Sequence, residues 1–336
     1  MPEPLLAVRD LHVTLRGGGH AIPAVRGLSF GVRQGEVVAL VGESGAGKSL
    51  TARAVLGMPP HGAGVTGSVR LRGRELRGAS YAGVWGRRMA FVPQDALTVL
   101  SPVHTVGDQI TAAVRSVAKT SRQEARARAV AALDRVGIAD AARRARAYPH
   151  EFSGGMRQRA VIAMAMVNEP ELVIADEPTT ALDPAVEAQV LEALATAREA
   201  TGAALVLITH DLRIVARHAD RVVVMYAGRA VESGPVEPVF RAPRAPYTAG
   251  LIASLPPAEV DAADRWLPSI AGAPPSPTHL PRGCAFAPRC PLARQDCEDQ
   301  EPALAAAGEP GQLAACHHST DLPVPATGLF SRKATA

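Results

Sequence analysis

Eight consecutive residues combine small side chains with one lysine and one hydroxyl in the pattern G-x-x-x-x-G-K-[ST]: Gly42, Glu43, Ser44, Gly45, Ala46, Gly47, Lys48 and Ser49. Small residues let the backbone turn tightly, so that consecutive N–H groups point at one phosphate group. We expect Lys48 to contact the β- and γ-phosphates of a nucleotide, and Ser49 to bind Mg²⁺, which prefers oxygen ligands. Thr51 is a further candidate, for the α-phosphate. A buried strand before the segment and a helix after it favour a phosphate-binding loop over an ordinary glycine-rich turn.

Two carboxylates, Asp176 and Glu177, end an apolar run. Successive side chains of a strand point to opposite faces, so these two cannot do the same work. We expect Asp176 to face the Mg²⁺ shell and Glu177 to polarise an attacking water; the alternative is a solvated acidic pair. His210 follows another apolar run, and ligands of open α/β sheets bind where parallel strands end. We therefore favour a contact from His210 to the γ-phosphate over a capping or surface role.

All four cysteines lie near the end of the chain: Cys284, Cys290, Cys297 and Cys316. Their spacing contains no C-x₂-C pair, so the usual zinc-finger pattern is absent. In a cytosolic chain, four thiols favour a metal over disulfides. The candidates are tetrahedral Zn²⁺ and an iron–sulfur cluster, because both take four thiolates; four unrelated thiols are the alternative. His317 and His318, beside Cys316, are possible further ligands, but we expect them to be solvated neighbours.

The elements that must position these residues alternate between strands and helices. Strands are expected at residues 5–8, 11–15, 35–41, 172–175 and 204–209. The helical pattern of residues 184–200, between the last two strands, is typical of a β–α–β unit in a parallel sheet. Residues 95–167 are predicted to be mainly helical, because segments such as 122–136 repeat apolar residues at three- and four-residue spacing.

Composition excludes several classes of protein. The 336 residues are 47% hydrophobic and 20% charged, which is typical of a globular chain. No apolar run reaches the roughly 20 residues that span a bilayer, and the first residues do not resemble a signal peptide, so we expect a cytosolic chain. A net charge of +4 is weak evidence for nucleic-acid binding. The stretch from Pro256 onwards holds 13 of the 28 prolines, and we interpret it as a loop-rich appendage that does not continue the sheet.

A further segment contains Ser153, Gly154 and Gly155 before a helical run, a pattern typical of a helix N-terminus that holds an anion. Together with the phosphate-binding loop and the acidic strand, it resembles the signature motif of ABC-transporter ATPases. The order of motifs also matches: Walker A loop, Q-loop at residues 91–95, signature, acidic strand, D-loop at 181–184, and His210. Two departures are Met156, where many members have glutamine, and residues 13–24, which contain no aromatic to stack on adenine. Leu15 and His20 are the candidates there.

The resemblance implies a head-to-tail dimer, in which each nucleotide lies between two ATPase domains. It assigns catalytic roles to Lys48, Gln94, Glu177 and His210, and Mg²⁺ binding to Ser49, Gln94 and Asp176. ATP contacts are implied for Gly42, Glu43, Ser44, Gly45, Ala46, Gly47, Lys48, Ser49 and Thr51, with Ser153, Gly154 and Gly155 contacting the nucleotide of the partner. Charge stabilisation and positioning should supply most of the rate, as in other phosphoryl transfers.

The C-terminal segments 244–248, 283–286 and 289–291 resemble the extension of oligopeptide and dipeptide importer ATPases. Ala245 replaces a histidine that is usual there. The resemblance implies a [4Fe-4S] cluster on the four cysteines, with Zn²⁺ as the alternative.

The fold implied is α/β: a P-loop NTPase (RecA-like) core with an N-terminal antiparallel β subdomain, an inserted helical subdomain and a small loop-rich cysteine appendage. The boundaries expected are 1–95 and 168–255 for the ATPase core, 96–167 for the helical signature subdomain, 256–323 for the extension and 324–336 for a flexible tail.

The function implied is ATP hydrolysis coupled to uptake of oligopeptides or dipeptides, at the cytoplasmic face of the inner membrane. The partners implied are a paralogous ATPase subunit, two transmembrane permease subunits and an extracytoplasmic substrate-binding protein, with no nucleic acid. One alternative is an importer ATPase for nickel or another small solute. Another is a soluble ABC ATPase acting on nucleic acid or ribosomes, which usually carries coiled coils or a second ATPase half. A regulatory ATPase without turnover is disfavoured by the presence of both Glu177 and His210.

Overall fold

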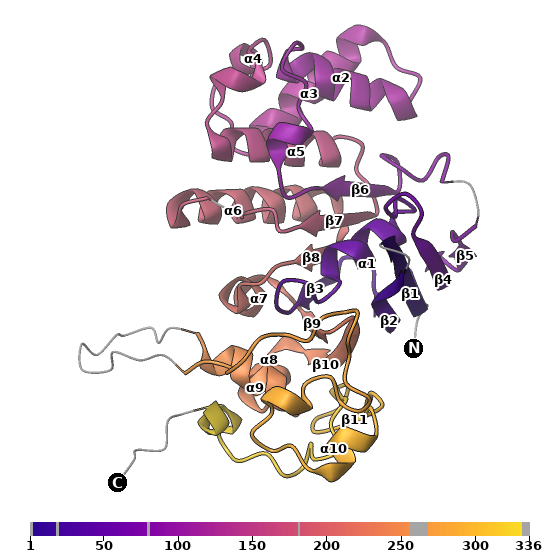
Figure 1. Cartoon of the computed structure of the whole chain (residues 1–336). Helices are drawn as coiled ribbons and strands as arrows, with labels where there is room; N and C mark the ends of the chain where they lie inside the picture. Colours follow the sequence, from indigo (N-terminus) through magenta and orange to yellow (C-terminus); the bar gives the residue numbers. More distant parts are fainter. Residues whose placement is uncertain (1–2, 18–19, 79–80, 181, 256–267, 331–336) are drawn as a thin grey trace. The chain divides into compact units, whose positions relative to one another are not determined.

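A computed structural model describes residues 3–17, 20–78, 81–180, 182–255 and 268–330 (Figure 1). The chain divides into two compact units, which are described separately. Unit 1 comprises residues 1–6, 31–37 and 70–208, and unit 2 comprises residues 7–30, 38–69 and 209–336. The D-loop residue Ala181, the start of the expected extension at 256–267 and the last six residues of the expected tail lie outside the described residues. The four-part division expected from the sequence stays a prediction.

A parallel sheet forms the centre of unit 1. Its strands pair in the order β6 (Met89–Val92), β7 (Leu172–Asp176) and β8 (Ala204–Ile208). All residues of β7 and β8 are buried, which explains their continuous apolar sequence. Helix α6 (Pro184–Thr201) connects β7 to β8. It begins at the N-cap Asp183, whose carboxylate accepts hydrogen bonds from two backbone N–H groups, and it ends at Gly202 in the left-handed conformation. The β–α–β unit expected from the sequence is confirmed.

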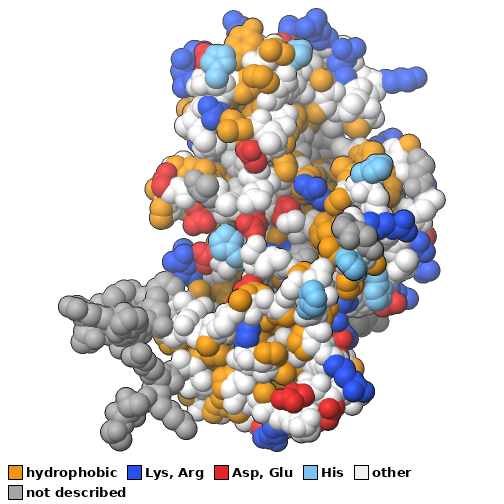
Figure 2. Space-filling model, in the orientation of Figure 1, with side chains coloured by type: hydrophobic (Ala, Val, Ile, Leu, Met, Phe, Trp, Pro, Cys, Tyr) orange, Lys and Arg blue, Asp and Glu red, His pale blue; other side chains and the backbone are white. Residues whose placement is uncertain are grey.

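A helical segment follows β6 within unit 1. It contains α2 (Val106–Val117), α3 (Arg122–Arg135), α4 (Ala141–Arg144) and α5 (Gly154–Met166), with single 3-10 turns at Ala96–Thr98 and Pro149–Glu151. The helices α2, α3 and α5 begin at Thr105, Ser121 and Ser153, whose side chains accept a backbone N–H of the first turn. Lys and Arg side chains lie around the outer margin of this segment, at the top of the view in Figure 2.

The sheet of unit 2 begins with β3 (Val37–Val41), which pairs in parallel with β9 (Arg221–Tyr226). Strand β9 pairs antiparallel with β10 (Arg229–Pro235), and β10 pairs with β12 (Leu313–Ala314), which pairs with β11 (Ala305–Ala306). The expectation that the cysteine-containing stretch does not continue the sheet is therefore wrong for β11 and β12. Both strands are only two residues long, so their sequence carries too little alternation to reveal them.

The N-terminal strands of unit 2 are β1 (Leu6–Gly17), β2 (His20–Val32) and β4 (Gly64–Leu71), with β1 between the other two. In unit 1, the end of β4 pairs antiparallel with β5 (Arg74–Glu75). Two short strands were expected at 5–8 and 11–15, but β1 is continuous. It passes through the polar residue Asp10, which takes up a left-handed conformation with φ of 46°.

Unit 2 also contains α1 (Lys48–Val55), α7 (Leu212–His218), α8 (Val236–Arg241), α9 (Pro246–Ala253) and α10 (Gln295–Asp299), with 3-10 turns at Ala287–Arg289 and Ala326–Phe330. An aromatic trio packs in its core. The ring of Tyr226 lies 4.5 Å from that of Tyr247 and 5.4 Å from that of Phe286, centroid to centroid. Phe286 belongs to the cysteine-containing stretch, so this stretch packs against the sheet of its own unit. Among the described residues, no helix has the length and apolar character needed to cross a membrane.

Candidate functional site

The phosphate-binding loop connects β3 to α1 in unit 2, the strand–loop–helix order expected from the sequence. Two of its glycines are required by the backbone. Gly42 has a φ of 148°, and a Cβ there would lie 2.1 Å from the carbonyl oxygen of Met225. Gly47 has a φ of 96°, and a Cβ there would lie 2.6 Å from the carbonyl oxygen of Ala24. Any larger side chain at either position would push the loop away from its neighbouring strands.

Lys48 is buried, with 5% of its surface exposed. Its ammonium donates to the carbonyl oxygens of Gly42 at 2.7 Å and Glu43 at 3.1 Å, so it lies inside the curve of the loop. Ser49 is exposed at the start of α1, whereas Thr51 is fully buried and donates to the carbonyl oxygen of Gly47 at 2.9 Å. The assignment of Thr51 to the α-phosphate stays a prediction.

Glu43 makes contacts that sequence reasoning missed. Its carboxylate accepts two hydrogen bonds from the guanidinium of Arg289, and its backbone N–H donates to the hydroxyl of Tyr247 at 2.9 Å. These partners lie 246 and 204 positions further along the chain. The signal that could have revealed them is the carboxylate itself, because a negative side chain in a phosphate-binding loop needs a positive partner.

Unit 1 brings Gln94 and Glu177 together. The side-chain amide of Gln94 donates to the carboxylate of Glu177 at 3.4 Å, and the hydroxyl of Thr180 donates to the same carboxylate at 2.9 Å. Asp176 is the last residue of β7 and is buried. Glu177 follows it with a φ of 45°, held by a hydrogen bond from its N–H to the carbonyl oxygen of Ile208 at 2.9 Å. A left-handed, non-glycine residue at this position indicates backbone strain of the kind that clusters at functional sites.

The Ser-Gly-Gly segment opens α5 in unit 1. The hydroxyl of Ser153 caps the helix by accepting the N–H of Met156 at 3.3 Å. Ser153 and Gly154 are exposed, whereas Gly155 is buried against Val186 at the start of α6. This exposed, capped N-terminus suits an anion, because its unpaired N–H groups carry partial positive charge.

His210 is an exposed residue of unit 2, directly before the N-cap Asp211 of α7. Hydrogen bonds from Arg213 hold the pKa of the Asp211 carboxyl below its ordinary value, although burial opposes this.

The predicted site residues are divided between the two units. The phosphate-binding loop and His210 belong to unit 2. The residues Gln94, Asp176, Glu177, Ser153, Gly154 and Gly155 belong to unit 1.

All four cysteines line one cavity of about 50 Å³ in unit 2, together with the aromatic rings of Tyr226 and Phe286. None forms a disulfide. Burial raises the pKa of the Cys284 thiol above its ordinary value. It also raises the pKa of Cys290 to about 11 and the pKa of Cys316 to about 12. The raised pKa values favour the protonated thiols of Cys284, Cys290 and Cys316, and a bound metal would instead stabilise their thiolates. The donor set therefore fits Zn²⁺ or an iron–sulfur cluster.

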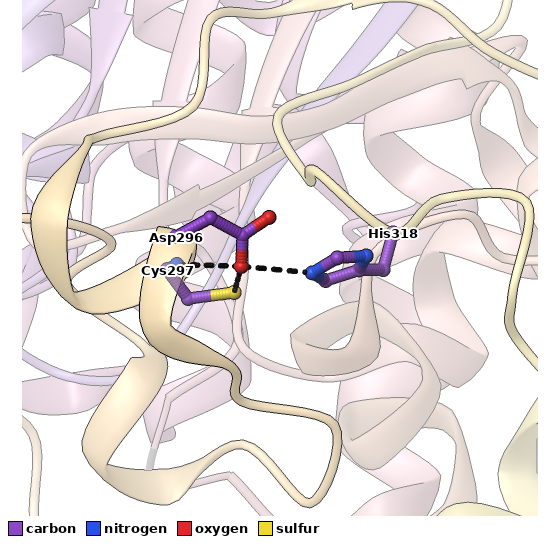
Figure 3. Close-up of side chains that lie close together, drawn as sticks. All are labelled: Asp296, Cys297 and His318. Atoms are coloured by element: carbon purple, nitrogen blue, oxygen red, sulfur yellow. Dashed lines mark hydrogen bonds and ion pairs between the residues drawn. The ribbon is translucent and has the colours of Figure 1, made fainter.

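A second donor group adjoins this cavity at Asp296, Cys297 and His318 (Figure 3). One carboxylate oxygen of Asp296 accepts the N–H of Cys297 at 2.9 Å and lies 3.1 Å from Nε2 of His318. The hydrogen bond with His318 lowers the pKa of the Asp296 carboxyl. Cys297 belongs to both groups. Because His318 and Asp296 already bind each other, we interpret them as groups that orient the segment around the cysteine cavity. His317 lies apart, against the carbonyl oxygen of Gln300 at 2.9 Å.

Comparison with known proteins agrees with these features. Residues 25–180 match the ABC transporter family, and residues 231–297 match the C-terminal region of oligopeptide/dipeptide transporters. A post-hydrolysis dimer of an ATP-binding cassette bound to ADP and Pi has a similar fold, with a TM-score of 0.61 and 24% identity over 69% of this chain and 98% of that chain. The cbiO1 protein of Clostridium perfringens gives a TM-score of 0.61 and 26% identity over 71% of this chain and 91% of that chain. The expected P-loop NTPase fold is confirmed.

Relatives that match most of this chain include two transport ATP-binding proteins. Over 90% of its own length, this chain is 52% identical to the oligopeptide transport ATP-binding protein OppD of Mycobacterium tuberculosis. The match spans only 50% of the length of that relative. The chain is 44% identical to the dipeptide transport ATP-binding protein DppD of Bacillus subtilis, over 88% of this chain and 89% of that protein. The chain belongs to the family of ATP-binding proteins of oligopeptide and dipeptide ABC transporters.

Proposed function

We propose that the chain is the ATP-binding and ATP-hydrolysing subunit of an ABC importer that takes up oligopeptides or dipeptides. The observation that carries this proposal is the combination of a folded phosphate-binding loop with the transporter C-terminal region in one chain. In this role, Lys48 and the loop N–H groups hold the phosphates, and Ser49, Gln94 and Asp176 bind Mg²⁺. Glu177 polarises the attacking water, and His210 contacts the γ-phosphate.

The chain works as one half of a pair in this proposal. The exposed N-terminus of α5, with Ser153 and Gly154, contacts a nucleotide held by a partner ATPase subunit, and the partner supplies the same contact in return. ATP draws the two subunits together because its γ-phosphate has donors on both sides. Hydrolysis removes that bridge, and the subunits separate. We propose a paralogous subunit as the partner.

Coupling to transport runs through unit 1. The amide of Gln94 contacts Glu177, and exposed apolar side chains follow it along the chain, with Leu97 63% and Val103 73% exposed. Exposed large apolar residues beside a catalytic contact suit a protein partner. We propose that this surface docks two transmembrane permease subunits at the cytoplasmic face of the inner membrane, and that an extracytoplasmic binding protein delivers the substrate. No nucleic acid takes part.

The cysteine cavity has a proposed cofactor of its own. Cys284, Cys290, Cys297 and Cys316 would hold a [4Fe-4S] cluster, with Zn²⁺ as the alternative. The bound metal or cluster would supply four metal–thiolate bonds. These bonds would cross-link a stretch of short elements that has little hydrophobic core of its own. Iron, zinc and acid-labile sulfide analysis of the anaerobically purified chain distinguishes the two. Serine at all four cysteines should abolish metal binding and impair assembly, and normal assembly without any metal would refute the structural role.

The function is tested by co-purifying the chain with its membrane partners and reconstituting the complex in vesicles. ATP hydrolysis should rise when a peptide-loaded binding protein is added on the side opposite to the ATPase. Lys48→Ala should abolish hydrolysis, whereas Lys119→Ala, at an exposed lysine of unit 1, should not. A binding protein that takes nickel or another solute instead of peptides would overturn the substrate class and leave the ATPase role intact.

A further inference from the structure

A carboxylate inside the phosphate-binding loop poses an electrostatic problem. ATP brings several negative charges to the loop, and a like charge within a few ångströms disfavours their binding. Glu43 is the second residue of that loop, and its side chain is 26% exposed. A loop that binds phosphate with an acidic residue in this position therefore needs a fixed cation to neutralise it.

Arg289 supplies that cation. Its two terminal nitrogens donate to the two carboxylate oxygens of Glu43 at 2.8 and 3.0 Å, a bidentate arrangement. Only 6% of the Arg289 side chain is exposed, so solvent screens the pair poorly. Both residues belong to unit 2.

The guanidinium of Arg289 is itself held in place from three sides. It donates to the hydroxyl of Tyr226 at 3.2 Å and to the carbonyl oxygen of Ala271 at 3.0 Å. It also lies over the rings of Tyr226 and Phe286, at 5.8 and 5.9 Å from their centroids.

The same loop residue is fixed through its backbone. The N–H of Glu43 donates to the hydroxyl of Tyr247, and Tyr247 packs against Tyr226 and Phe286 in the aromatic trio. The loop is thus held at one residue by a side-chain ion pair and a backbone hydrogen bond. Both come from residues beyond position 240.

We propose that Arg289 is a positioning residue for ATP binding, which acts by neutralising and orienting Glu43 in the phosphate-binding loop. The inference rests on the proposed role of that loop in ATP binding. Arg289 directly precedes Cys290, and Phe286 lies two residues after Cys284. Arg289 therefore connects the segment around the cysteine cavity to the phosphate-binding loop. Through this connection, the C-terminal stretch helps to set the affinity of the loop for nucleotide.

The test is equilibrium binding of a fluorescent ATP analogue to the purified full chain. Arg289→Ala should weaken binding about 10- to 100-fold, because it leaves the Glu43 carboxylate unpaired beside the phosphates. Adding Glu43→Gln to Arg289→Ala should recover at least about tenfold, because the repelling charge is then gone. Arg241→Ala is the matched control, since Arg241 pairs with Glu309 on the surface of the same unit and should leave binding unchanged.

Each outcome separates the inference from the proposed function. Unchanged binding in Arg289→Ala, while Lys48→Ala loses it, would overturn the inference alone. Retained binding in Lys48→Ala would instead overturn the assignment of the loop. A loss in Arg289→Ala that Glu43→Gln does not restore would show that Arg289 is merely structural. Should Arg289→Ala fail to fold, Arg289→Gln carries the same test, because it keeps the side-chain length and loses the charge.

Discussion

Gly155 is the residue of the Ser-Gly-Gly segment at which a single added methyl group should have the largest effect. A Cβ at this position would lie 2.2 Å from Cγ1 of Val186, where carbon atoms normally pack at about 3.5–4.0 Å. Val186 is β-branched and lies in the first turn of α6, so its χ1 angle cannot change cheaply. Gly155→Ala must therefore push α5 and α6 apart.

The expected magnitude follows from two opposing terms. Overpacking costs about 1–3 kcal/mol, whereas replacing glycine by alanine in a helix gains about 0.5–1 kcal/mol. Gly155→Ala should thus lower the free energy of unfolding by about 1–2 kcal/mol. Gly154→Ala is the matched control, because its nearest neighbour would be Cδ2 of Leu182 at 3.7 Å, an ordinary contact. Because Gly154 is also part of α5 and its Cβ meets no clash, this control should match wild-type stability or exceed it by up to about 1 kcal/mol.

Urea unfolding of the full chain, followed by circular dichroism, measures both variants. Adding Val186→Ala to Gly155→Ala removes the clashing methyl group, so the double variant should be more stable than the sum of the two single changes by about 1 kcal/mol. Wild-type stability in Gly155→Ala, or an equal loss in Gly154→Ala, would refute the packing argument.

Three further changes test other parts of the structure by urea unfolding. Glu232 is fully buried and accepts hydrogen bonds from two backbone N–H groups and the amide of Gln312, so Glu232→Gln should cost about 1–3 kcal/mol by leaving a donor unpaired; no loss would contradict this network. Burial would raise the pKa of Glu171, but hydrogen bonds from Arg88 and Arg72 outweigh it and lower the pKa. A lowered pKa stabilises the fold above the unfolded-state pKa of about 4.5, and this contribution is lost as pH falls through the lower folded-state pKa. The loss caused by Arg88→Met, about 1 kcal/mol at pH 7, should therefore shrink progressively as pH falls below about 4.5; a loss that is the same at all pH values would contradict this ion pair. Asp183→Ala removes the cap of α6 and should cost about 1 kcal/mol, and an unchanged midpoint would show that the cap is dispensable.

The parts of the fold that sequence reasoning predicted are those with local physical signals. The strands β7 and β8 are continuous apolar runs because they are buried on both faces, and the helical pattern of residues 184–200 between them corresponds to α6. The phosphate-binding loop was equally readable, since its glycines and Lys48 are dictated by the backbone and by phosphate charge. The roles given to Gln94, Asp176, Glu177 and His210 stay predictions.

The features that sequence reasoning missed depend on long-range contacts. Arg289 is one of many arginines, and nothing near it in the sequence indicates that it reaches Glu43. The two-residue strands β11 and β12 exist because β10 offers an edge, and Leu313 and Ala314 alone do not indicate a strand. The polar residue Asp10 likewise suggests that a strand ends there. Strand β1 nevertheless continues through this position, because Asp10 adopts a left-handed conformation.

In the proposed function, this chain hydrolyses ATP and Glu177 activates the attacking water. The most direct test is single-turnover ATP hydrolysis by the assembled transport complex that carries Glu177→Gln in this subunit. We expect the variant to bind ATP with wild-type affinity and to retain it unhydrolysed at this site. Hydrolysis at the wild-type rate, with this site occupied, would contradict it.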